Sequence, residues 1–198
     1  MVKKQIAKVD QGDKVGRFFA FLQGINVGKR TVKSLQLIEA FSAVGLDNVQ
    51  TFLASGNVAF ETGRRDLDML RGEIEKQLIK SLGFESKTFL RSLDEIVRIA
   101  NANMFGLNAY QQKNFTVNVS LLDKPATAAM KKRLATLRSD YDDFACCDSE
   151  IWWLCRGPKI SDSKLFQGNR LKKDDDGPST MRNQRTLQRL AEKFGLPS

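Results

Sequence analysis

The order in which short apolar runs alternate with helix-like stripes constrains the fold of this chain more than any other feature of its sequence. Residues 17–23 form an apolar, phenylalanine-rich run that stops at Gly24, which is typical of a buried strand. Apolar residues then recur at helical spacing up to Gly45, where a helix is expected to end. Two strand-like runs follow and meet at residues 55–57, where the Gly-Asn pair predicts a tight hairpin turn.

The next predicted elements are a second helix, a strand and a short helix. Five apolar residues at helical spacing predict a second helix: Leu67, Leu70, Ile74, Leu78 and Leu82. A strand over residues 85–91 and a short helix to about residue 102 come after it. The order β-α-β-β-α-β is that of the split βαβ, or ferredoxin-like, arrangement.

The pattern then restarts in the second half of the chain. It predicts a strand over residues 115–122, a helix over 124–138, a hairpin over 142–156, a helix over 159–168 and a final helix over 181–194, without an evident last strand. We therefore predict an α+β protein of duplicated ferredoxin-like halves with antiparallel sheets. A mobile basic tail is expected over residues 1–16, the first half over 17–102, and the second half, with its C-terminal basic helix, over 103–198.

The composition bounds the possible partners and chemistry. The chain has 198 residues and a formal net charge of +9, and a basic surface attracts nucleic acids, anionic lipids and acidic proteins. It has no apolar run near the roughly 20 residues that span a bilayer, and residues 1–16 do not resemble a secretory signal. Three clustered cysteines, Cys146, Cys147 and Cys155, suit reduced thiols, so a cytoplasmic protein without membrane attachment is expected.

The sequence contains no histidine. This removes the usual general base near neutral pH, the Ser/His and Cys/His nucleophile pairs, and the commonest transition-metal ligand. The cysteines have no C-x-x-C spacing, and the run Asp174–Asp176 lacks the alternating ligands of a calcium loop. We therefore predict no catalytic residue, no metal site and no cofactor.

The stretch GINVGKRT at residues 24–31 is a candidate anion site. It is shorter than the phosphate-binding loop G-x-x-x-x-G-K-[ST], so nucleotide hydrolysis is not expected. Backbone N–H groups of a glycine turn ahead of a helix nevertheless favour negative charge. The candidate residues are Gly24, Asn26, Gly28, Lys29 and Arg30. The alternative is that the glycines only supply positive φ at a strand-to-helix corner while the cations lie in water.

The predicted final helix is the second candidate. At about 100° per residue, four cations of this helix fall within one arc of roughly 80°: Arg182, Arg185, Arg189 and Lys193. Asn183 lies in the same segment and is included in the candidate site. A basic helix face of one sign could lie along a phosphate backbone, although every amphipathic helix has a solvated face.

The turn at residues 55–57 carries Ser55, which no histidine can activate, so a hairpin turn explains it better than a nucleophile elbow does. Whether this turn lies near residues 24–30 depends on the end of the sheet at which it sits. The sequence leaves both placements open.

Three segments together resemble a known family. GINVG at residues 24–28, SGNVAF at 55–60 and MRNQRT at 181–186 are similar to landmarks of a bacterial family called domain of unknown function 1697. The resemblance covers about residues 17–195 and implies a duplicated ferredoxin-like fold but no activity. This chain differs from the family pattern at Gln23, where an arginine is usual, at Lys29, where a second glycine is usual, and at Gln184, where an aromatic residue is common.

From these features we predict a basic, non-catalytic module that binds an anionic partner, either a nucleic acid or a nucleotide. Five cations are assigned to the phosphate contacts: Lys29, Arg30, Arg182, Arg185 and Arg189. One alternative is a small-molecule enzyme that acts on a phosphorylated substrate in a cleft between the halves. Another is a protein-interaction scaffold. The sequence makes no prediction of oligomeric state.

Overall fold

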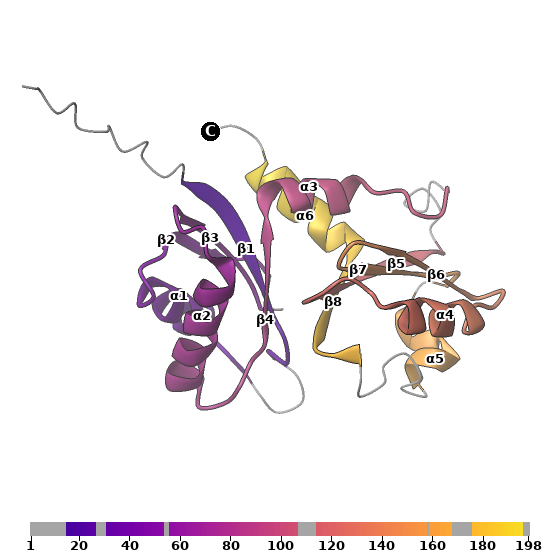
Figure 1. The fold of residues 1–198 in the computed structure, drawn as a ribbon, viewed down its shortest axis with the longest axis horizontal. Coiled ribbons are helices and arrows are strands. Elements are labelled where there is room, and N and C mark those ends of the chain that lie inside the picture. The colour runs from indigo at the N-terminus through magenta and orange to yellow at the C-terminus, as the bar shows by residue number, and fades with distance from the viewer. Residues whose placement is uncertain are drawn as a thin grey trace, which may run out of the picture.

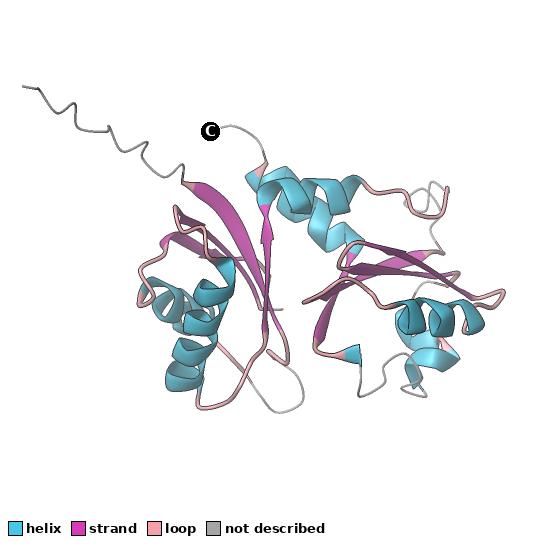
Figure 2. Cartoon of the chain, viewed as in Figure 1, coloured by secondary structure: helices cyan, strands magenta, loops and turns pink. Residues whose placement is uncertain are grey.

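Two four-stranded antiparallel sheets with the same strand order form the frame of the protein (Figures 1 and 2). The computed structural model describes residues 15–26, 31–53, 56–106, 114–157, 159–167 and 176–195. The first sheet has the order β2-β3-β1-β4: β1 Gly16–Leu22, β2 Asp47–Thr51, β3 Asn57–Thr62 and β4 Thr88–Ser92. The second has the order β6-β7-β5-β8: β5 Thr116–Leu122, β6 Asp142–Cys147, β7 Glu150–Cys155 and β8 Ser179–Asn183. This repetition confirms the predicted α+β class with duplicated ferredoxin-like halves.

The helices also repeat, although unequally. The first repeat contains α1 Ser34–Ser42, α2 Leu67–Leu82 and α3 Leu93–Asn101. The second contains α4 Ala128–Thr136, the 3₁₀ turn η1 Ile160–Asp162, α5 Lys164–Gln167 and α6 Gln184–Phe194. No helix in the described ranges combines the length and the apolar character that crossing a bilayer requires.

Local sequence sets the ends of the helices. At the start of α2, the Asp66 side chain accepts a hydrogen bond from the Met69 N–H at 2.8 Å, and Gly83, with φ of 77°, ends the helix. At the start of α3, Ser92 and Glu95 form a reciprocal capping box. Both helices therefore begin where the sequence offers a capping side chain, and α2 also ends at a glycine.

The second repeat has a last strand that the sequence analysis did not find. Residues 179–183 form β8, so the helix predicted over residues 181–194 begins at Gln184, and Arg182 lies in a strand rather than on a helix face. The buried residues of β8 are Thr180 and Arg182, which are polar, so the strand has no apolar alternation. The helix predicted over residues 159–168 consists of η1 and the four-residue α5.

The predicted tail and first strand meet at Gly16. Residues 1–14 of the predicted basic tail lie outside the described residues, whereas Gly16 already belongs to β1. β1 pairs with β3 on one side and with β4 on the other, both antiparallel. It is thus a central strand of its sheet, as the apolar run at residues 17–23 suggests.

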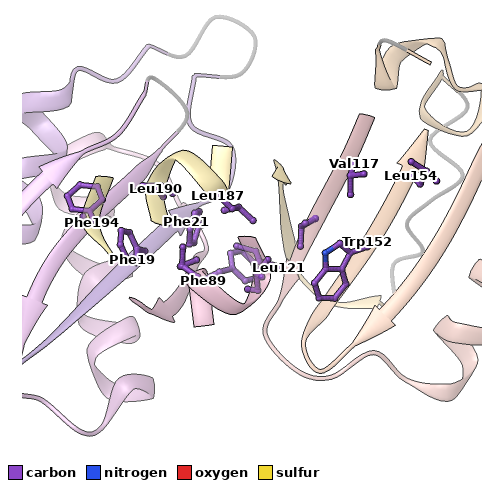
Figure 3. Close-up of a cluster of buried hydrophobic side chains, with 14 residues drawn as sticks. Phe19, Phe21, Phe89, Val117, Leu121, Trp152, Leu154, Leu187, Leu190 and Phe194 are labelled. Atoms are coloured by element: carbon purple, nitrogen blue, oxygen red, sulfur yellow. The ribbon is translucent and has the colours of Figure 1, made fainter. Parts of the chain in front are cut away.

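Each sheet is buried on both faces. In β1, Ala20 and Leu22 join an apolar cluster with α1 and α2, whereas Phe19 and Phe21 join a central cluster. The central cluster contains side chains from both sheets and from α3 and α6, as Figure 3 shows. A third cluster lies between the second sheet and α4 and α5. The halves therefore pack together through apolar inner faces, with α3 and α6 side by side along one edge (Figure 1).

Candidate functional site

The three sequence segments singled out above meet where the two halves join. The Leu22 N–H, at the end of β1, donates to the Gly56 carbonyl at 2.8 Å. The side chain of Gln23 reaches β8, where its amide nitrogen donates to the Ser179 carbonyl at 2.8 Å. The hairpin turn before β3 therefore lies beside the turn after β1, which the sequence left open. We refer to residues 23–26, 56–57 and 179–183 as the landmark junction.

Gly56 holds two of these segments in close contact. Its φ is +67°, and a Cβ placed on it would lie 2.9 Å from the Cβ of Ile25 and 3.1 Å from that of Leu22. Any other residue would have to adopt a left-handed conformation and displace the neighbouring strand end. β2 and β3 pair antiparallel on either side of this turn, which confirms the predicted hairpin. The tight Gly-Asn turn is wrong in detail, because β2 ends at Thr51 and Asn57 already belongs to β3. Ser55 lies outside the described residues.

Arg182 is the cation at the centre of the landmark junction, and only 8% of it is exposed. Its Nε donates to Asn57 Oδ1 at 2.6 Å, and its Nη2 donates to the carbonyl oxygens of Leu22 at 3.0 Å and Gly56 at 3.4 Å. Its Nη1 donates to Thr180 Oγ1 at 2.7 Å. Because β8 belongs to the second repeat, Arg182 links the two halves.

Burial changes the proton affinity of this arginine. The loss of solvent lowers the pKa of Arg182 to about 10, because an apolar environment disfavours the charged form. This value still lies above neutral pH, so the side chain stays a cation under physiological conditions. A phosphate contact of Arg182 stays a prediction, since the acceptors described for it are oxygens of this chain.

Arg91 is the counterpart of Arg182 in the first repeat, since each is the fourth residue of a five-residue strand. It reaches in the opposite direction: its Nη2 donates to the carbonyl oxygens of Leu122 at 3.0 Å and Ser149 at 3.2 Å. Its Nε donates to Glu150 Oε1 at 3.0 Å. Sequence reasoning missed this reciprocal pair, because the partners lie far apart in the chain and neither stands in a motif.

The exposed face of α6 carries the cations that the sequence analysis placed together, except Arg182. Arg185, Arg189 and Lys193 are exposed, and no carboxylate among the described residues lies within 4.0 Å of them. Asn183 begins the helix: its Oδ1 accepts the Arg185 N–H at 2.9 Å. The row of cations on this helix therefore begins at Arg185, about one turn after Arg182, where the sequence analysis placed its start.

An aromatic side chain that sequence reasoning missed lies against this basic face. The ring centroid of Phe52 is 5.6 Å from Arg189 Cζ and 5.7 Å from Lys193 Nζ. Asn57 holds the Phe52 backbone, because its Nδ2 donates to the Phe52 carbonyl at 3.0 Å while its Oδ1 accepts from Arg182. The landmark junction and the α6 face are therefore physically connected. We refer to Arg185, Arg189, Lys193 and Phe52 as the α6 basic face.

The turn after β1 is described only in part. Gly24 and Asn26 have φ of 73° and 55°, and Asn26 Oδ1 accepts the Val32 N–H at 2.7 Å, which closes the loop. Gly28, Lys29 and Arg30 lie outside the described residues. Anion binding by this turn therefore stays a prediction.

The cysteines do not gather a reactive centre among the described residues. Burial raises the pKa of the Cys155 thiol to about 12, and it also raises the pKa values of Cys146 and Cys147. These thiols are protonated at neutral pH and pack as small side chains. In the part of the chain that the structure describes, no group of three cysteine or acidic residues is placed to hold a metal ion.

A small cleft of about 140 Å³ lies where the halves meet, lined in part by Arg71, Lys87, Glu75 and Asp123. Arg71 is paired with Asp123, and Lys87 Nζ lies 3.0 Å from Glu75 Oε2. The cations that a phosphorylated substrate would need here already face carboxylates. This cleft is therefore less suited to an anion than the α6 basic face is.

Comparisons with known proteins agree with this fold. The profile of a family described as protein of unknown function (DUF1697) matches residues 15–152. Among solved structures, the conserved bacterial protein SP0830 from Streptococcus pneumoniae is similar, with a TM-score of 0.69 and 16% sequence identity over 92% of this chain and 99% of that chain. No curated protein matches. At this identity the likeness concerns the fold alone.

Proposed function

The chain belongs to the DUF1697 family of proteins of unknown function, and we propose that it is a non-catalytic module that binds a single-stranded nucleic acid along its α6 basic face. The observation that carries this proposal is the set of three exposed cations on one helix face without a carboxylate partner among the described residues. Such cations bind phosphates by releasing condensed counterions.

Several of the other described cations provide a contrast. Arg17, Arg64 and Arg138 each lie in an ion pair with a glutamate or an aspartate. A cation that already has a carboxylate partner gains less from a phosphate, because the two anions compete for it. The α6 basic face is not neutralised in this way.

The spacing and the aromatic ring favour a single strand. Residues 185, 189 and 193 are one helical turn apart and rise about 6 Å from one to the next. Phe52 is half-buried and its ring centroid lies 5.6 Å and 5.7 Å from two of these cations, so a base could stack on the exposed part of its ring. Asn57 and Arg182 act as positioning residues, because they hold the turn that carries Phe52.

The proposal is tested by fluorescence anisotropy with a labelled 20-nucleotide RNA, and with DNA of the same sequence, at rising salt. We expect binding at low salt that weakens steeply as salt rises. Replacing all three cations, Arg185→Ala, Arg189→Ala and Lys193→Ala, should lower the slope of log K against log salt by about 2. Phe52→Ala should weaken binding about tenfold with little change in that slope.

A matched control removes three exposed lysines elsewhere: Lys76→Ala and Lys80→Ala on α2 with Lys132→Ala on α4. This variant changes the net charge equally, so it should keep most of the affinity. The absence of RNA binding at low salt would contradict the proposal. An equal loss of affinity in the two triple variants would contradict a specific role for α6. The location in the cytoplasm, expected from the cysteines, stays a prediction.

A further inference from the structure

A mostly apolar cavity lies in the second repeat, away from the α6 basic face. It has a volume of about 290 Å³ and lies between the second sheet and the helices α4 and α5. Its apolar lining includes Leu122, Met130, Phe144, Trp153, Phe166 and Met181. Its size is at the lower end of the range for small-molecule sites.

The duplication explains why the cavity exists. In the first repeat, the sixteen-residue α2 packs Leu70, Ile74 and Leu78 against the equivalent face of the sheet. In the second repeat, the element before the last strand is the four-residue α5. Among the described residues, this face of the sheet is therefore filled in the first half and leaves a cavity in the second. Native interiors are close-packed, so a cavity of this size calls for an explanation.

One polar side chain in the cavity wall has unused hydrogen-bond donors. Arg133 on α4 is paired through Nη2 with Asp176, and the two side chains are only 16% and 15% exposed. The Nε and Nη1 atoms of Arg133 are buried and have no acceptor among the described residues. Leaving buried donors of a charged group unsatisfied is costly, and native structures rarely do so without a ligand, ion or water at the site.

We propose that this cavity binds a small organic acid, with its carboxylate on the free donors of Arg133 and its aliphatic or aromatic body against the apolar wall. A carboxylate fits better than a phosphate monoester, because Asp176 already offsets part of the Arg133 charge and would repel a dianion. The apolar wall excludes a strongly polar body. This site is independent of nucleic-acid binding by α6.

The test uses octanoate as the probe and octan-1-ol as a neutral ligand of the same chain length, titrated by calorimetry into the full-length protein. Tryptophan fluorescence is followed in parallel, because Trp153 lines the cavity. We expect octanoate to bind at least tenfold more tightly than octan-1-ol. A phosphate monoester of the same length, octyl phosphate, should bind more weakly than octanoate.

Two variants separate the roles of charge and space. Arg133→Met with Asp176→Asn replaces the buried ion pair without leaving one charge alone, and it should abolish the preference for octanoate over octan-1-ol. Ser120→Leu fills the cavity from the strand β5 and should weaken both ligands about tenfold or more, while a thermal melt shows that the protein is folded.

Three results would overturn the proposal. One is octanoate that does not bind, and the second is octanoate that binds no better than octan-1-ol. The third is an Arg133→Met, Asp176→Asn variant that is folded and keeps the full preference for the acid. Because the RNA titration does not depend on Arg133, failure here leaves the proposal for α6 untouched.

Discussion

Arg91 and Arg182 occupy equivalent positions in the two repeats, yet they are held in different ways. Each lies in the last strand of its sheet and donates to the end of the first strand of the other half. Arg91 also donates to the buried carboxylate of Glu150, whereas Arg182 donates to the neutral amide of Asn57. The comparison shows that the same strand position can hold a buried arginine with a carboxylate in one half and, among the described acceptors, with neutral oxygens in the other.

The two solutions differ in what surrounds the cation. Glu150 is only 1% exposed and also accepts from Arg98 Nη2 at 2.9 Å, so Arg91 belongs to a network of three charged groups. Burial lowers the pKa of Arg182 to about 10, and the acceptors described for this side chain are neutral oxygens. Sequence landmarks of the family lie around Arg182 and not around Arg91. The arginine whose described acceptors are neutral is thus the one beside the proposed binding surface.

The largest effect is expected from breaking the ion pair of the first arginine. Glu150→Ala should lower the free energy of unfolding by about 3–5 kcal/mol, because it leaves Arg91 buried without its carboxylate. Urea denaturation measures the change. Asp143→Ala is the control, since Asp143 pairs with the more exposed Arg138 and Arg156, and the loss there should be below about 1 kcal/mol. Equal losses in the two variants would contradict the distinction.

Removing the second arginine should cost less, because its described acceptors are neutral. Arg182→Met should lower the free energy of unfolding by about 2–3 kcal/mol through the lost hydrogen bonds to Leu22, Gly56 and Asn57. A loss as large as that of Glu150→Ala would show that Arg182 is held as firmly as Arg91 is.

The same variant gives a pH dependence with a defined sign. The pKa of Arg182 is about 10 in the folded protein and higher in the unfolded chain, so between these values the unfolded state binds more protons. The stability of the wild-type protein relative to Arg182→Met should therefore rise above pH 10, by about 1 kcal/mol at pH 11. Chemical denaturation of both proteins from pH 8 to 11 measures it. A difference in stability between the two proteins that does not change with pH would contradict the lowered pKa of Arg182.

An effect smaller than that of Arg182→Met is expected when the partner of Arg182 is made a carboxylate, like the partner of Arg91. Asn57→Asp gives Arg182 a carboxylate partner, as Glu150 is for Arg91. The nearby cation should lower the pKa of the new carboxyl, so the added stability is present above its unfolded pKa and is lost as pH falls through the folded value. Relative to wild type, the variant should lose about 1–2 kcal/mol between pH 6 and pH 3. If the stabilities of the variant and the wild-type protein change with pH in the same way, the new carboxylate does not pair with Arg182.

The sequence predicted the repeated elements because their apolar periodicity is strong. The apolar side chains of β1 and of the α2 stripe are buried or half-buried, as the pattern predicted. It missed β8, because Thr180 and Arg182 are buried by contacts with the other half, and no local pattern reveals such contacts. For the same reason Arg182 was placed on a helix. The turn after β1 lies beside the turn before β3 because of the order of the strands in the sheet. The periodicity of apolar residues does not predict that order.

The smallest effect on stability is expected on the exposed face of α6, which completes the comparison between buried and exposed arginines. Arg189→Ala should change the free energy of unfolding by less than about 0.5 kcal/mol, since this side chain is exposed and its contact with Phe52 is weak in water. Denaturation in urea beside Arg182→Met gives the contrast within one experiment. A loss above about 1 kcal/mol would mean that Arg189 holds the Phe52 turn in place, and its effect on RNA binding would then be indirect. A small loss with weakened RNA binding would instead assign the exposed cations to recognition and the buried ones to the frame that presents them.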